Sequence, residues 1–193
     1  MEKWIGFFGG SFNPPHLGHL LASIYAIKTF ELDEIWLAPV FKHRFEKDLA
    51  PYDDRIRMCE LLVEGFEKYL KVSPIEKNRK SNGKTLETLL AMRKKHPHHH
   101  FSLIIGSDLK KETKQWYRFK EIENRFGVLV VPRGCGKGGE LGIPDISSTE
   151  IRKRLKGNKW LGELVTPAVA AYIFEKGLYR QSTLPRSPRR RDK

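Results

Sequence analysis

Short apolar runs alternate with longer segments of helical periodicity, and this alternation limits the fold more than any other feature of the chain. Each run has about the length of a buried strand, and each longer segment places apolar residues at helical spacing. The predicted strands are residues 4–8, 35–40, 70–73, 101–105 and 127–131. The predicted helices are residues 17–30, 53–69, 85–95, a short helix after Ser147, and residues 167–176.

Strands that alternate with helices favour right-handed crossovers and a parallel sheet that is covered on both faces. The expected fold class is therefore α/β, with a Rossmann-like doubly wound parallel sheet in a single domain. At 193 residues the chain is long enough for one such domain. We place the domain at residues 1–180. Residues 181–193 form a basic tail whose only apolar side chains are Leu184 and prolines, which predicts disorder.

The chain is strongly basic, with a formal net charge of +13. Residues 180–193 hold six basic residues and one acid, so they account for +5 and leave +8 for the rest. This excess indicates an anionic partner. Nucleic acid, a membrane surface and a nucleoside triphosphate would all fit it.

Several sequence features bear on where the protein works. No apolar run approaches the roughly 20 residues that a membrane-spanning helix needs, which predicts no membrane partner. The N-terminus becomes glycine-rich before an apolar signal-peptide region develops, so we expect a cytoplasmic protein. Cys59 and Cys135 have no metal-ligand spacing and are expected to be reduced thiols.

The loop after the first predicted strand, GGSFNPPHLGH, begins with residues suited to contact with a phosphate. Gly9 and Gly10 let backbone amides approach a bound group closely, and Ser11 adds a hydroxyl donor. The helix that follows points its free amides at the same loop. The carboxyl ends of the strands are also where an open parallel sheet binds ligands.

Two histidines complete this loop. His16 and His19 are three residues apart at the start of the predicted helix, so both side chains can donate hydrogen bonds to one anion. Gly18 between them leaves room for a flat base. The alternative is a capped helix that carries two incidental histidines.

GGSFNPPHLGH resembles the HxGH signature of the nucleotidyltransferase superfamily related to class I aminoacyl-tRNA synthetases. A second segment, ISSTEIR at residues 146–152, looks like the ISSTxIR signature of nicotinate and nicotinamide mononucleotide adenylyltransferases. Serine and threonine hydroxyls at a helix start, with Arg152 one turn later, can contact triphosphate oxygens. Alone, this segment would also fit an ordinary helix cap. The resemblance covers about residues 4–180.

Three other segments resemble the same family, although each also fits a structural role. The segment IIGSD looks like the family's GxD segment, whose aspartate, here Asp108, approaches the nucleotide ribose or the metal. Trp116 matches the tryptophan that stacks on the pyridine ring. Lys47 matches a lysine that binds phosphate, and Arg55 and Met58 continue that pattern.

The sequence departs from the family at two places. Many bacterial nicotinate-type enzymes have a Ser-Tyr-Thr segment that reads the pyridine carboxylate, and here only Thr85 of GKTL matches it. The bacterial PPHK loop is also absent, and the loop with Lys47 looks nearer to that of eukaryotic nicotinamide enzymes. The choice between nicotinate and nicotinamide is therefore left open. Lys84 would attract a carboxylate, or would simply face solvent.

The resemblance implies an enzyme that transfers an adenylyl group from ATP to nicotinate or nicotinamide mononucleotide, giving the dinucleotide and pyrophosphate in NAD biosynthesis. It implies Mg²⁺ held mainly by substrate phosphates, with no metal site built by the protein. The implied catalytic residues are His16, His19, Lys47 and Arg152. The implied ATP-binding residues are Gly9, Ser11, Phe12, Gly18, Ser147, Ser148, Thr149 and Arg152. The implied mononucleotide-binding residues are Gly10, Ser11, Thr85, Gly106, Asp108 and Trp116.

Two other functions compete with this interpretation. A different HxGH adenylyl- or cytidylyltransferase, such as a phosphopantetheine enzyme, would keep the first motif, but ISSTEIR and Trp116 argue against it. A basic nucleic-acid-binding module would explain the charge but leaves the glycine-histidine loop without a role. The tail alone could still contact nucleic acid. A homo-oligomer is compatible with the sequence, which does not decide the oligomeric state.

Two clusters are assigned no function. His96, His98, His99 and His100 lie between a predicted helix and strand, and we interpret them as a solvated polar turn rather than a metal site. Residues 133–139 are glycine-rich and contain a lysine, but they lack the spacing of a phosphate-binding P-loop. We interpret them as a flexible loop.

Overall fold

The computed structural model describes most of the chain. Lys47, which the resemblance assigns to phosphate, lies outside the described residues, and so does the basic tail. The described ranges are residues 1–42, 49–78, 83–134, 142–159 and 161–179.

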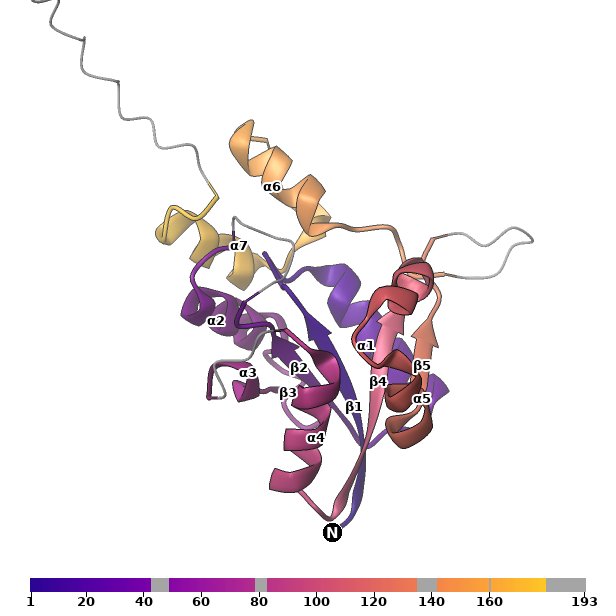
Figure 1. Ribbon diagram of the computed structural model, residues 1–193. Helices are drawn as coiled ribbons and strands as arrows, with labels where there is room; N and C mark the ends of the chain where they lie inside the picture. The colour runs from indigo at the N-terminus through magenta and orange to yellow at the C-terminus, as the bar shows by residue number, and fades with distance from the viewer. Residues whose placement is uncertain (43–48, 79–82, 135–141, 160, 180–193) are drawn as a thin grey trace, which may run out of the picture.

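In these ranges five parallel strands form one sheet in the order β3-β2-β1-β4-β5 (Figure 1). The predicted α/β fold class is confirmed, and each predicted strand is present. In Figure 1 the strands point away from the N-terminus, toward the end of the molecule where α6 and α7 lie. The strands are β1 (Lys3–Gly10), β2 (Glu34–Pro39), β3 (Leu70–Val72), β4 (His99–Gly106) and β5 (Val128–Val131).

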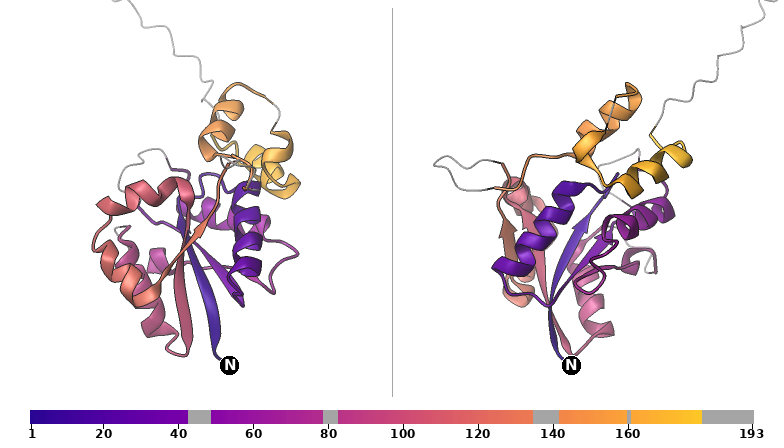
Figure 2. Two further views of the ribbon diagram at one scale, coloured as in Figure 1. Left: turned by 90° about the vertical axis from the view of Figure 1, so that its right-hand side faces the viewer. Right: turned by 180° about the vertical axis from the view of Figure 1, so that it is seen from behind.

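Helices cover both faces of the sheet, as predicted (Figure 2). Helices α1 and α2 pack on one face, and α3, α4 and α5 pack on the other. The helices are α1 (Leu17–Thr29), α2 (Tyr52–Leu62), α3 (Ile75–Asn78), α4 (Thr85–Lys95), α5 (Phe119–Phe126), α6 (Ser148–Lys156) and α7 (Pro167–Glu175), with 3₁₀ helices η1 (Ser107–Gln115) and η2 (Gly162–Leu164).

Two apolar layers hold the helices on the sheet, because successive side chains of a strand point to opposite faces. On β4, Ile104 belongs to the layer under α1 and α2, whereas Leu103 and Ile105 belong to the layer under α4 and α5. All three side chains are buried. A central strand that is apolar on both faces is what a doubly wound sheet requires.

The strand order reverses between β1 and β4. The chain moves outward from β1 through β2 to β3, and then returns to place β4 on the other side of β1. Ligands of open α/β sheets bind at the carboxyl ends of the strands where the order reverses. The loop that carries His16 follows β1, and the segment that carries Asp108 follows β4, so both begin at this point.

The structure corrects some element boundaries. The prediction of a helix over residues 53–69 is wrong beyond Leu62, because the chain turns at Gly65 with a φ of +83°. Helices α3 and α5 and the 3₁₀ helix η1 are not among the predicted elements. His99 and His100 belong to β4 rather than to a polar turn, and the His100 ring stacks on the Trp4 ring at 4.4 Å. Within the described ranges, no helix combines the length and apolar character of a membrane span.

Candidate active site

The two histidines of the β1–α1 loop lie against each other. Their ring centroids are 3.7 Å apart, and the His19 ring also packs on the Phe12 ring at 4.8 Å. His16 is the N-cap of α1, and its backbone N–H donates to Nδ1 of His19 over 3.2 Å. The sequence-predicted pair is therefore brought together at the start of α1.

This contact fixes how the proton of His19 is placed. Because Nδ1 accepts a hydrogen bond, the proton of a neutral His19 ring lies on Nε2, which becomes the free donor. Burial first, and then the nearby Arg133 guanidinium, lowers the pKa of His16 to about 3. Burial, His16 and Arg133, in that order, lower the pKa of His19 well below its usual value. Both rings are thus neutral donors at pH 7. Nδ1 of His16 is buried and has no hydrogen-bond partner within the described part of the chain.

The glycines around the pair leave it no spare room. A Cβ on Gly18 would lie 3.0 Å from ring atoms of His16, and a Cβ on Gly10 would lie 3.3 Å from the Phe12 ring. The Phe12 side chain is itself buried, and its backbone has a φ of +47°. Phe12, one of the residues assigned to ATP, thus supports the histidine pair through its ring contact with His19.

Helix α6 brings the second motif to the same loop. The Ser148 hydroxyl donates to the Pro14 carbonyl over 2.8 Å, and the Arg152 guanidinium donates to the Asn13 carbonyl over 2.7 Å. These contacts join residues more than 130 positions apart in the sequence. The two recognised motifs therefore build one site, which the sequence alone could only suggest.

The other hydroxyls of this segment have structural contacts as well. Ser147 is the N-cap of α6, and its Oγ accepts the backbone N–H of Glu150 over 3.2 Å. Thr149 Oγ1 accepts a long 3.4 Å bond from Arg152. A hydroxyl that accepts a hydrogen bond still has its own proton to donate. Both residues can therefore serve the helix and an anion together.

Asp108 lies in the first turn of η1, two residues after the end of β4. Its carboxylate pairs with the Arg133 guanidinium at 2.9 Å, and Arg133 also pairs with Asp145 at 3.3 Å. A Cβ on Gly106 would lie 2.2 Å from an Asp108 oxygen and 2.9 Å from Cδ of Arg133, so a larger residue there would displace both side chains. The interpretation of residues 133–139 as a flexible loop is wrong for Arg133, whose side chain is held by these contacts.

Thr85 and Trp116 belong to a second part of the same edge. Thr85 opens α4, and Trp116 ends η1 with its ring packed edge-on against Phe119 at 6.0 Å. The neighbouring residues join the two segments, because the Lys84 ammonium lies 4.7 Å from the centre of the Tyr117 ring. Lys84 also pairs with Glu87 at 3.2 Å, so it is held by protein groups rather than facing solvent alone.

Two residues support the site in ways that the sequence pattern did not assign. The buried Arg55 donates to the carbonyl of Ser11 over 2.8 Å and to that of Ala50 over 3.0 Å. The buried Asn13 side chain accepts the backbone N–H of Ala50 over 3.0 Å. Together they fasten the histidine loop to the β2–α2 loop. The sequence pattern included Arg55 beside the Lys47 loop but did not predict that it links these two loops.

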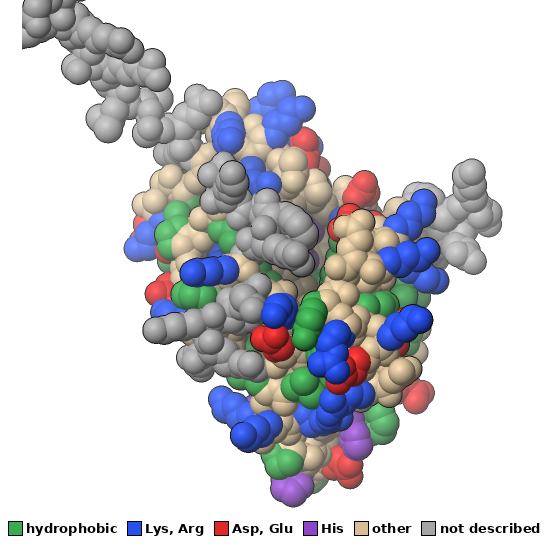
Figure 3. Space-filling view, viewed as in Figure 1, with side chains coloured by type: hydrophobic (Ala, Val, Ile, Leu, Met, Phe, Trp, Pro, Cys, Tyr) green, Lys and Arg blue, Asp and Glu red, His purple; other side chains and the backbone are tan. Residues whose placement is uncertain are grey.

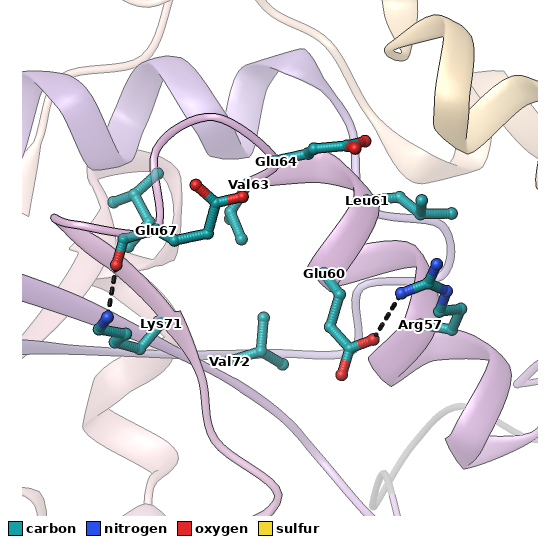
Figure 4. Close-up of a pocket in the computed structure, with 9 residues that line it drawn as sticks. Arg57, Glu60, Leu61, Val63, Glu64, Glu67, Lys71 and Val72 are labelled. Atoms are coloured by element: carbon teal, nitrogen blue, oxygen red, sulfur yellow. Dashed lines mark hydrogen bonds and ion pairs between the residues drawn. The ribbon is translucent and has the colours of Figure 1, made fainter.

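A separate hollow of about 400 Å³ lies between the end of α2 and β3, and residues that line it include Glu64, Leu61 and Val72 (Figure 4). None of the residues that line it belongs to the predicted site.

The basic side chains do not form a single patch on the face shown in Figure 3. On the face in Figure 3, Lys and Arg side chains are interleaved with Asp and Glu rather than gathered into one stripe.

Comparisons with known proteins agree with this geometry. Residues 7–154 match the cytidylyltransferase-like family model. The chain is 43% identical to a "probable nicotinate-nucleotide adenylyltransferase" of Anaeromyxobacter sp. (strain K), over 91% of this chain and 96% of that protein. It is 38% identical to a protein of the same description from Myxococcus xanthus (strain DK1622), over 94% and 97% of the two chains.

Solved structures show the same fold. The nicotinic acid mononucleotide adenylyltransferase of Plasmodium falciparum, in complex with NaAD, matches with a TM-score of 0.75 and 23% identity, over 92% of this chain and 97% of that one. The family match, the curated relatives and the shared fold therefore agree with the two motifs that meet at the end of β1. This chain belongs to the nicotinate-nucleotide adenylyltransferase family.

Proposed function

We propose that this protein transfers the adenylyl group of ATP to nicotinate mononucleotide, giving the dinucleotide and pyrophosphate. The observation that carries the proposal is the meeting of the histidine pair with the start of α6, where Arg152 and Ser148 bond to the β1–α1 loop. Donors from both ends of the chain converge at the point where the strand order reverses. Such a cluster suits a polyphosphate.

The reaction requires the protein to position the two substrates and to neutralise their negative charge. The 5′-phosphate of the mononucleotide attacks the α-phosphorus of ATP. The bond between the α-phosphorus and the oxygen that bridges it to the β-phosphorus breaks, and pyrophosphate leaves. A phosphate monoester with a second pKa of about 6 is already mostly dianionic at neutral pH, so the nucleophile needs no general base. The rate acceleration then comes from holding the mononucleotide phosphate in line with the ATP α-phosphate and from stabilising the leaving pyrophosphate.

The side chains divide between these tasks. We assign His16 and His19 to the ATP phosphates, as neutral donors whose pKa values the pocket has lowered. Arg152 and the hydroxyls of the α6 start serve the β- and γ-phosphates. Lys47 is proposed as a further phosphate contact. The backbone of Gly9, Gly10 and Ser11 faces the mononucleotide.

Mg²⁺ fits this site as an ion that the substrate phosphates bring. Asp108 and Asp145, the carboxylates at the carboxyl edge, are both paired with Arg133. Within the described ranges, no group of three His, Cys, Asp or Glu side chains is placed to hold a metal. When bound, the ion would neutralise phosphate charge, with water and phosphate oxygens as its main ligands.

Thr85 and Trp116 are the residues we propose for the pyridine ring. They lie on adjoining segments at the same edge, since Lys84 and Tyr117 are in contact. We propose nicotinate as the preferred base because the curated relatives are described as nicotinate-nucleotide enzymes. The acid carries a charge that the amide lacks, and the positive end of α4 favours it.

One assay tests the proposal. Pyrophosphate release from ATP is measured with nicotinate mononucleotide, nicotinamide mononucleotide, phosphopantetheine or no acceptor. The proposal expects release, with matching dinucleotide, from the nicotinate acceptor at the highest kcat/KM. Release with phosphopantetheine alone would support the competing transferase. No release with any acceptor, together with salt-sensitive binding to nucleic acid, would support the binding module.

A further inference from the structure

Arg133 connects three segments at the carboxyl edge of the sheet. Its backbone N–H donates to Ser107 Oγ over 3.0 Å, which ties the end of β5 to the end of β4. One guanidinium nitrogen donates to Asp108 over 2.9 Å. The other donates to the Ile146 carbonyl over 2.8 Å and to Asp145 over 3.3 Å. The planar fork of arginine suits such a set of acceptors in fixed directions.

The guanidinium also lies beside the histidine loop. A Cβ on Gly18 would be 3.4 Å from Cβ of Ile146, the residue whose carbonyl Arg133 binds. The charge of Arg133 also contributes to the lowered pKa of both His16 and His19. The Arg133 guanidinium therefore lies next to the site that we propose for ATP.

We propose that Arg133 is a positioning residue, which acts by holding the Asp108 carboxylate in place for a nucleotide ribose. This inference rests on the proposed function, in which two nucleotides bind at the carboxyl edge of the sheet, where Asp108 follows β4. The Asp108 side chain is 48% exposed, and among the described residues its ion-pair partner is Arg133. An unpaired carboxylate here would be free to rotate.

Charge gives a second reason for the pair. A carboxylate close to a triphosphate repels it, and this repulsion grows where water is excluded. The Arg133 guanidinium compensates the Asp108 charge while leaving carboxylate lone pairs to accept hydrogen bonds from ribose hydroxyls. Lysine would supply the charge but not the fork that reaches Asp108 and Ile146 together.

The test is a double-mutant cycle with Arg133→Ala, Asp108→Asn and the double variant. KM for ATP, KM for the mononucleotide and kcat are measured for each. Arg133→Ala is expected to raise KM for one nucleotide by about tenfold or more, and Asp108→Asn to raise KM for the same nucleotide. The double variant should be little worse than either single one. Arg133→Lys should recover part of the loss.

Arg125→Ala is the matched control, because Arg125 makes a comparable 2.7 Å ion pair with Glu121 on α5, outside the site. It should leave both KM values unchanged. The inference is overturned if the effects of Arg133→Ala and Asp108→Asn on KM multiply, or if Arg133→Ala lowers only kcat. If Arg133→Ala does not fold, Arg133→Lys and Asp108→Asn must still raise the same KM. An inactive wild-type protein would instead count against the proposed function.

Discussion

The protonation state of the histidine pair is set by a few neighbouring groups. His16 and His19 are neutral in the unliganded protein because burial and a nearby guanidinium oppose their protonation. Neutral donors can still polarise a phosphate, and they leave the positive charge of the site to Arg152 and Arg133. A bound polyanion would raise both pKa values, since an opposite charge favours the protonated form.

Gly18→Ala tests whether the position of the His16 ring matters. The added Cβ would lie 3.0 Å from His16 Cε1 and Nδ1, so the ring must shift. A displacement of catalytic groups by about 1 Å can cost about 10²-fold in rate, and the smaller shift needed here should cost less. We expect a several-fold fall in kcat for dinucleotide formation, with a small change in the melting temperature.

Gly157→Ala is the matched control for this substitution. Gly157 follows α6 with a φ of −92°, and a Cβ there would make only contacts of 3.6 Å or longer. It should leave kcat unchanged. An equal loss of activity in both variants would mean that the effect of Gly18→Ala is not specific to the histidine.

At the scale of elements, α6 is the part of the fold that completes the site. The Arg152 and Ser148 contacts hold its start on the β1–α1 loop, and Arg133 holds Ile146, two residues before the helix. Its apolar side, with Ile151 and Leu155, is buried in the same layer as α1 and α2. A helix fixed by both its core face and its polar start keeps phosphate donors in position.

The N-caps of α6 and α7 give a matched test of this role. Ser147→Ala and Thr166→Ala each remove a hydroxyl that accepts a backbone N–H in the first turn. Each should lower the free energy of unfolding by about 1 kcal/mol. Ser147→Ala alone should also raise KM for ATP, because α6, unlike α7, begins at the proposed ATP site. Equal changes in KM for ATP in both variants would contradict the assignment of the α6 start to the ATP phosphates.

The sequence predicted the elements well where the periodicity was strong. The alternation of apolar runs and helical segments is sufficient for the parallel sheet and for α1, α2, α4 and α7. It missed η1, whose nine residues include a single apolar one, Leu109, and it missed α3 and α5, which have only four and eight residues. The end of α2 depends on a single glycine at position 65, which periodicity does not detect.

At the scale of the whole molecule, the positive charge has several separate uses. Arg55, Arg133 and Arg152 hold loops together at the carboxyl edge. On the face that Figure 3 shows, the lysines and arginines are interleaved with acids. The +5 of residues 180–193 lies outside the described residues. The net charge alone therefore indicated an anionic ligand without locating it.

Motifs predicted the candidate site better than composition did. The residues of GGSFNPPHLGH and ISSTEIR meet in space, because each motif lies on one short segment with its own local geometry. Arg133 was not predicted because its role depends on contacts with Asp108 and Ile146, which are distant in sequence. Such long-range pairs have no local pattern. Arg55 and Asn13 belong to recognised segments, but their contacts with Ser11 and Ala50 were likewise not predicted.

The buried histidines also predict how global stability depends on pH. His16 protonates near pH 6.5 in the unfolded chain but only near pH 3 in the folded protein. The unfolded state therefore binds more protons between these values, and the free energy of unfolding should fall as the pH drops below 6.5. The contribution of His16 is at most about 1.4 kcal/mol per pH unit.

Urea unfolding at pH 7 and pH 5 measures this loss. His16→Asn should lose less stability than the wild type between the two pH values, whereas the variant of an exposed histidine, His98→Asn, should lose as much. A wild type that is equally stable at both pH values would show that His16 carries no such penalty.

The most direct test of the whole account is dinucleotide formation by His19→Ala beside the wild type. Both are supplied with ATP, Mg²⁺ and nicotinate mononucleotide, and the product is quantified by chromatography, with circular dichroism to show that the variant is folded. The account predicts a folded protein whose kcat has fallen by about 10² or more, as expected when a preorganised donor to the developing charge is removed. A folded His19→Ala variant with wild-type kcat would contradict the placement of adenylyl transfer at the end of β1.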